Sequence, residues 1–149
     1  MSASGLSPIQ AALYALFVGD GTLMALIDGV FDDIPEGTET KYIVLGDATE
    51  VPFLTFGFRV GINSARGHTG TFSVDVWTKD DVTSAGYKVA QTIIDRMTEI
   101  IEANSLVVAG HTTVTAEYKR GELLRSVDAR TNEMWRHGVA MYDITVQDT

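Results

Sequence analysis

One segment, residues 82–102, constrains the fold more than any other. Its apolar residues recur every three or four positions, and its charged and amide residues occupy the opposite side. The apolar set is Val82, Ala85, Val89, Ala90, Ile93, Ile94, Met97, Ile100 and Ile101. At 1.5 Å per residue the segment would form a helix about 31 Å long. Such a helix must bury its apolar side, so we expect it to lie across a sheet.

Extended segments flank this helix on both sides. Residues 71–78 alternate, with Phe72, Val74 and Val76 directed to one face. Other extended segments are expected at 30–31 (a short piece at a sheet edge), 42–45, 51–58, 112–118 and 135–146. The last of these has apolar residues on both faces: Ala140, Tyr142, Ile144 and Val146 on one, Val139 and Met141 on the other. A strand of this kind must be covered on both sides.

The N-terminal part predicts a shorter helix. Ser7-Pro8 is typical of a helix start, and Gly19-Asp20-Gly21 stops the helix before a short second turn at 22–27. The apolar stripe between these signals consists of Ile9, Ala12, Leu13, Leu16 and Phe17. The order helix, strands, long helix, strands predicts an α+β fold: a mostly antiparallel sheet packed against one long and one shorter helix. We expect residues 1–149 to form a single domain.

Composition narrows the classes of partner. The chain has 20 acidic and 11 basic residues and a net charge of -9. This excess of acidic residues argues against binding of duplex DNA by the outer surface, and against an anionic membrane surface as a partner. It does not exclude a channel through which DNA slides. Cysteine is absent, which excludes disulfides, thiolate metal sites and a thiol nucleophile. The N-terminus has no basic region ahead of an apolar run, so we expect a soluble, unexported chain.

The sequence gives little support for catalysis. The three histidines, His68, His111 and His137, are far apart, and a zinc site built from all of them is the minor alternative to surface or structural roles. Carboxylates gather in two loops: Asp28, Asp32, Asp33 and Glu36 in one, and Asp75, Asp80 and Asp81 in the other. A metal-dependent hydrolase would need such groups to converge, whereas acidic loops are usually solvated surface. No phosphate-binding loop or nucleophile elbow is present. We therefore expect a protein that is not an enzyme, with no cofactor or metal.

Two segments have no helical or strand periodicity. Residues 57–70 contain four glycines together with Arg59, Arg66 and His68, which predicts a long loop. Residues 121–132 are polar and charged except for three apolar side chains, and could be a long hairpin loop or a projecting arm. Unpatterned segments that carry basic residues in an acidic protein are candidates for docking.

Four stretches, in order, resemble one known family. They are Ile9-Gln-Ala-Ala-Leu-Tyr-Ala-Leu with Leu23-Met-Ala-Leu-Ile-Asp-Gly-Val-Phe-Asp, Tyr42-Ile-Val-Leu-Gly-Asp-Ala, Phe72-Ser-Val-Asp-Val-Trp-Thr, and Arg136-His-Gly-Val-Ala-Met-Tyr-Asp-Ile-Thr-Val. Together they resemble the tail-completion (tail-terminator) proteins of long-tailed bacteriophages. The sequence departs from the family pattern at Lys41, where proline is common, and in the length of the glycine-rich stretch.

The resemblance implies a structural virion protein of the tail or neck, assembled in the host cytoplasm. It implies a ring, commonly of six copies, that ends the tail tube and joins it to the head connector. Its partners would be the tail-tube protein and the connector or stopper protein, with DNA passing through the lumen without specific binding and no membrane involved. A head-completion or stopper protein of the same neck is the nearest alternative.

Two sets of residues follow as candidates for these contacts. The candidates for inter-subunit or docking surfaces are Phe58, Arg59, Arg66, His68, Leu123, Leu124, Arg125, Arg130 and Trp135. The acidic candidates for the lumen are Asp28, Asp32, Asp33, Glu36, Asp80 and Asp81. Like charge would let DNA pass along an acidic wall without sticking.

Overall fold

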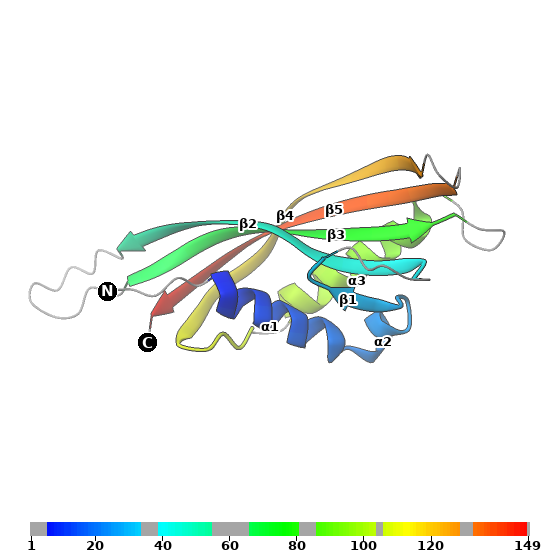
Figure 1. Cartoon of the computed structure of the whole chain (residues 1–149). Helices are drawn as coiled ribbons and strands as arrows, with labels where there is room; N and C mark the ends of the chain where they lie inside the picture. The colour runs from blue at the N-terminus through cyan, green and yellow to red at the C-terminus, as the bar shows by residue number, and fades with distance from the viewer. Residues whose placement is uncertain are drawn as a thin grey trace, which may run out of the picture.

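The computed structural model describes residues 6–33, 39–54, 66–80, 86–103, 106–128 and 133–148. Its centre is a five-stranded sheet with the helices on one face (Figure 1). The helices are α1 (Leu6–Val18), α2 (Gly21–Met24) and α3 (Lys88–Ala103). The strands are β1 (Gly29–Phe31), β2 (Lys41–Leu54), β3 (Arg66–Lys79), β4 (His111–Asp128) and β5 (Glu133–Asp148). This is the α+β architecture predicted from the sequence, with α3 as the long helix and α1 as the shorter one.

The strand order is β1-β2-β3-β5-β4. All neighbours pair antiparallel except β1, which runs parallel to β2. Bulges interrupt the ladder between Leu45 and Ala48 in β2, and at Thr113/Thr115 and Tyr118/Arg120 in β4. β5 lies between β3 and β4. Its face towards the helices is buried, whereas Val139 and Met141 on the other face are half-buried, so the expected cover on both faces is absent within the described part of this chain.

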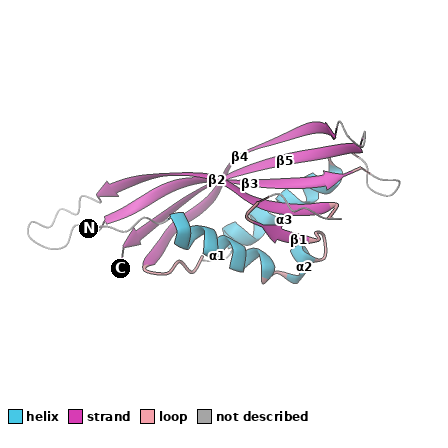
Figure 2. Ribbon diagram, in the orientation of Figure 1, coloured by secondary structure: helices cyan, strands magenta, loops and turns pink. Residues whose placement is uncertain are grey.

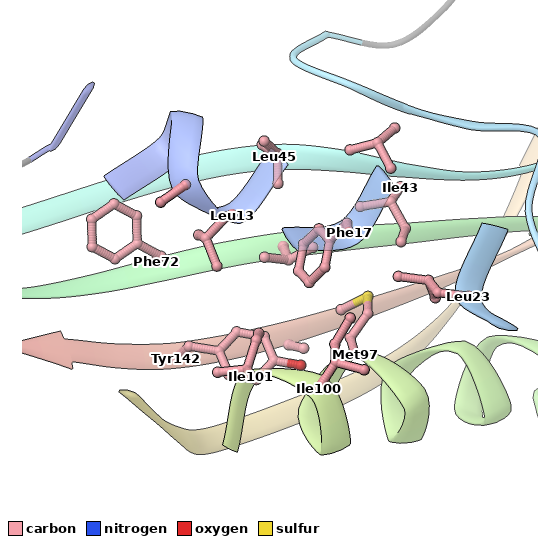
Figure 3. Close-up of a cluster of buried hydrophobic side chains, with 14 of the residues drawn as sticks. Leu13, Phe17, Leu23, Ile43, Leu45, Phe72, Met97, Ile100, Ile101 and Tyr142 are labelled. Carbon is pink, nitrogen blue, oxygen red and sulfur yellow. The ribbon is translucent and has the colours of Figure 1, made fainter. Parts of the chain in front are cut away.

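The predicted amphipathic helix packs its apolar side on the sheet. The buried residues of α3 are Ala90, Ile93, Ile94, Met97, Ile100 and Ile101. Opposite them, Tyr142 of β5 is fully buried, and its hydroxyl bonds Thr98 Oγ1 at 2.9 Å (Figure 3). Burial raises the pKa of Tyr142. At Gly138 an added Cβ would stand 2.8 Å from Ile94 Cδ1, so glycine here permits the close approach of α3 to β5.

The two N-terminal helices are tied to α3 by one carboxylate. Asp20 caps α2 by accepting a bond from the Leu23 N–H at 2.8 Å. The Arg96 guanidinium of α3 donates to both oxygens of Asp20, at 2.9 and 2.7 Å. These bonds hold the pKa of the Asp20 carboxyl below its ordinary value, the Arg96 bond being the largest cause. Ile9, Leu13 and Phe17 of α1 complete the core beneath the sheet.

The strands are much longer than the helices that cover them. β4 has 18 residues, so at about 3.4 Å per residue it spans roughly 60 Å. α3 has 16 residues, which at 1.5 Å each extend about 24 Å. The sheet therefore continues beyond the helical layer, most clearly at the C-terminal end of β2 (Figure 2). No helix among the described residues is long and apolar enough to span a membrane.

Several predicted boundaries were wrong. The segments expected at 42–45 and 51–58 form the single strand β2 up to Leu54, and residues 66–70, expected in a loop, belong to β3. Residues 121–128 continue β4, so this segment is the arm rather than a loop. α3 begins at Lys88 and α2 ends at Met24, both shorter than predicted. Val82 and Ala85, part of the predicted stripe of the long helix, lie outside the described residues, and the buried Leu106 and Val108 precede β4.

We predict that Asp20→Ala lowers the free energy of unfolding by roughly 1–2 kcal/mol, because it removes a helix cap together with the Arg96 contact. Urea denaturation near neutral pH measures this, with Asp95→Ala on the exposed side of α3 as the control. Since the folded-state pKa of Asp20 is lowered, its stabilisation is present above about pH 4 and is lost as the pH falls through the folded pKa. A stability difference that stayed constant down to about pH 2 would contradict the assignment.

Candidate assembly surfaces

The sheet face opposite the helices carries a group of aromatic side chains, here called the aromatic face: Phe31, Tyr42, Trp77, Trp135 and His137. Tyr42 lies between the rings of Phe31 and Trp135, at centroid distances of 6.1 and 6.0 Å in edge-on geometry. Trp77 and His137 stack in parallel at 4.0 Å. These residues come from four strands, and the pairing register brings them together.

The aromatic face combines buried and half-exposed side chains. Tyr42 is only 6% exposed, and burial raises the pKa of its hydroxyl, with Glu39 as a second cause. Trp77 and Trp135 remain partly exposed, as do Val139 and Met141 on the same face of β5. Tryptophan and tyrosine are enriched in the centres of protein interfaces. This surface is therefore suited to contact with another protein.

Polar contacts border the aromatic face. His137 Nε2 lies 3.0 Å from Asp75 Oδ1, and Lys79 pairs with Glu133 at 2.6 Å. Towards the other end of the same strands the side chains become hydroxyls and carboxylates. There Thr71 donates to Asp143 at 2.7 Å, and Thr69 and Thr145 share a bond of 3.2 Å. The open face thus has an aromatic half and a polar half.

The C-terminal end of β4 forms an exposed hairpin with β5. We call this hairpin the arm: residues 120–128 of β4, paired without a bulge with residues 133–141 of β5. Its β4 side carries three exposed apolar residues, Leu123, Leu124 and Val127, at 37%, 47% and 50% exposure. Within the described part of the chain, β4 pairs only with β5, so the arm presents a free strand edge.

The opposite edge of the sheet contains a groove of about 470 Å³. We call it the edge groove; its lining residues are Gln10, Ala11, Tyr14, Val30, Phe31, Asp32 and Leu45. The groove lies where α1 meets β1 and β2, and its walls are mostly apolar. Tyr14 lies on the outer side of α1 and is 47% exposed.

The acidic lumen candidates differ in their surroundings. Asp28 accepts bonds from the Thr40 and Lys41 N–H groups at 2.7 and 3.1 Å, which lower its carboxyl pKa. Asp80 is bound by the Arg136 guanidinium at 2.9 Å. Asp32 and Asp33 are exposed, and Glu36 and Asp81 lie outside the described residues. Asp28 and Asp80 therefore have internal roles, and the lumen assignment of all six residues stays a prediction.

The docking candidates are also distributed unevenly. Leu123, Leu124 and Arg125 are exposed on the arm, and Trp135 belongs to the aromatic face. The backbones of Arg66 and His68 lie in β3, but the structure does not describe their side chains. Phe58, Arg59 and Arg130 lie outside the described residues.

Sequence reasoning missed the aromatic face apart from Trp135. The available signal was Trp77, which alternates with the buried residues of β3 and so must lie on its other face. Tyr14 gave a similar signal, because it falls outside the apolar stripe of α1. No group of three His, Asp or Glu side chains in the described ranges is close enough to hold a metal ion.

Comparison with known proteins gives the fold and the family. A chain from a solved structure titled "Virion of native gene transfer agent (GTA) particle" superposes with a TM-score of 0.75, at 20% identity over 98% of this chain and 99% of that one. No curated protein matches the sequence significantly. A family model, described as tail completion protein gp17, matches residues 11–146. The chain therefore belongs to the tail completion protein gp17 family and is a structural protein of the virion tail.

Proposed function

We propose that this protein closes the head-proximal end of the tail tube as a ring and joins the tube to the head connector. The family match over residues 11–146 carries the proposal. The surfaces described above support it, because exposed strand edges and half-exposed aromatic side chains are typical of proteins that are completed by partners. In this role the protein performs no reaction, and its work is the formation of several specific contacts.

A ring of identical copies requires two different patches on each subunit. In a heterologous interface the patch on one copy meets the other patch on the next, and a suitable rotation closes the ring. The sheet offers two edges with different features, the arm on β4 and the edge groove beside β1. The aromatic face then remains for contact along the tail axis, with the tail-tube protein or the connector.

Charge supports passage of DNA without retention. Six copies would together carry a charge of about 6 × -9 = -54. A channel whose wall shares this negative sign repels the DNA backbone at short range, so DNA slides without specific binding. Purified rings should leave duplex DNA unshifted in a gel at low salt, and a salt-sensitive shift would contradict the proposal.

Electron microscopy tests the ring directly. We expect rings in negative stain, at high protein concentration or with tail tubes present, and tubes that carry a ring at one end. Tubes made without the protein should fail to join heads, and adding the protein should restore joining. A chain that remains monomeric with tubes, and leaves joining unaffected, would refute the role. Cross-linking to the tail-tube protein rather than only to the connector distinguishes a terminator from a stopper.

Val139→Lys tests the aromatic face. Val139 lies in register with Asp75 and Glu122, so a lysine would gain acidic neighbours and the subunit should remain folded. The added charge should nevertheless prevent burial of this face, so we expect joining of tails to heads to fall about tenfold or more. Thr145→Lys, on the polar half, is the matched control, and equal loss in both variants would contradict a specific role for the aromatic half.

A nuclease assay addresses the remaining alternative of a metal-dependent hydrolase. We expect plasmid DNA incubated with the protein and Mg²⁺ or Mn²⁺ to stay intact. Cleavage that copurifies with the protein, and is lost in Asp75→Asn or Asp80→Asn, would contradict a purely structural role.

A further inference from the structure

We propose that the arm of one copy binds along the edge groove of the next copy, adding its β4 edge to the β1 edge of that neighbour. This inference rests on the proposed ring and names the two surfaces that build it. It would join the sheets of successive copies through their edges. Each copy would contact one neighbour through its β4 edge and the other neighbour through its β1 edge.

The arm is an edge strand that lacks two of the usual protections against pairing, a bulge and a proline. Proteins commonly protect free edges with bulges, proline or inward-pointing charges. The two bulges of β4 precede the arm, and residues 120–128 pair with β5 in unbroken register. The arm contains no proline. A regular edge of nine residues with exposed Leu123, Leu124 and Val127 is suited to receive or supply a strand.

Strand polarity fits head-to-tail addition. β1, β2 and β5 run in one direction, and β3 and β4 run in the opposite direction. β4 is therefore antiparallel to β1 across the sheet. A second copy placed edge to edge, without being turned over, presents its β1 antiparallel to the β4 of the first. Antiparallel is the commoner pairing, and this placement repeats from copy to copy.

Side-chain direction fits the groove. Leu123, Arg125 and Val127 pair in register with Gly138, Arg136 and Met134, so they point to the helix side of the sheet. Most of the edge groove lies on this same side, where α1 and the core residues Val30 and Leu45 line it, and Phe31 of the edge strand lines its border with the other face. In a continuous sheet the two apolar side chains would meet the apolar walls of the groove, which include Ala11 and Tyr14. The exposed Tyr14 ring would become buried.

Charge is complementary between the two surfaces. The first 40 residues of the chain contain six acidic residues and no Lys, Arg or His; α1 and β1 themselves carry no charge, and Asp32 directly follows β1. Residues 119–128 contain three basic and two acidic residues, in a protein that is otherwise strongly acidic. Arg125 is exposed on the arm, and Asp32 is exposed at the groove. This contact would place Asp32 between copies rather than on the channel wall. Opposite charges fix the register and disfavour arm-to-arm pairing.

Cysteine cross-linking tests the contact, since the natural chain has no cysteine. One variant carries Val127→Cys on the arm and another carries Gln10→Cys in the groove. We expect a short bis-maleimide to link the two variants when they are mixed, and to give neither homodimer. A single chain with both changes should give a ladder of products up to the full ring. Asp95→Cys on the exposed side of α3, paired with Val127→Cys, is the control and should give no product.

The outcomes separate this contact from the ring itself. Rings seen by microscopy without the 127–10 product would overturn the contact and leave the proposed function standing. Homodimers of the Val127→Cys variant would also overturn it, because they report an arm-to-arm interface. A product with the tail-tube protein in place of the second copy would reassign the arm to an axial contact. Absence of rings even with tail tubes would refute the proposed function as well.

Charge reversal gives an independent readout. Arg125→Glu should raise the concentration needed for half-assembly by about tenfold, and Asp32→Arg in the same chain should restore assembly. The thermal unfolding of the monomer should be unchanged in both, since both side chains are exposed. Lys88→Glu, an exposed residue at the start of α3, is the matched control. If the doubly substituted chain folds normally but its assembly is not restored, the pairing of these two surfaces is contradicted.

Discussion

The difference in length between strands and helices determines most of this structure. A strand of 16 to 18 residues is more than twice as long as a helix of about the same number of residues, because the rise per residue differs by that factor. The helices of this chain are therefore too short to cover the whole of one sheet face. The other face, the outer edge of β4 and the C-terminal end of β2 stay outside the helical layer. The aromatic face and the arm lie in these uncovered regions.

The region that the helices cover depends on a few specific contacts. Gly138 allows α3 to approach β5 at Ile94, the Tyr142 hydroxyl bonds Thr98 of α3, and Asp20 links the N-terminal helices to Arg96. In residues 70–78 of β3 and 138–146 of β5, the residues on the helix side are buried and those on the other side are half-buried. A single pleat thus gives the core on one side and the aromatic face on the other. Changes on the aromatic face can therefore alter binding while the core remains intact.

The sequence predicted the parts of the fold that bury a face. The stripes of α1 and α3 and the alternation of β3 and β5 were correct because burial imposes a period on the residues. The sequence of residues 121–128 does not distinguish a loop from an arm, because nearly all side chains of this strand are exposed and burial imposes no pattern on them. Its conformation depends on the ladder with β5. The glycines of residues 66–70 predict a loop, but pairing with β2 and β5 holds this segment extended. The aromatic face required pairing across four strands, which no local pattern reveals.

An uncovered sheet edge is a hazard for an isolated soluble protein, since any other free edge can pair with it. This chain leaves apolar side chains on such an edge and carries a net charge that keeps copies apart in solution. Repulsion acts over the whole surface, whereas pairing acts only where two particular edges meet. A contact that brings the basic residues of the arm to the acidic N-terminal region reduces the repulsion locally and only in one orientation. Assembly would then occur at the correct edge, and would be favoured further when a tail tube holds several copies close together.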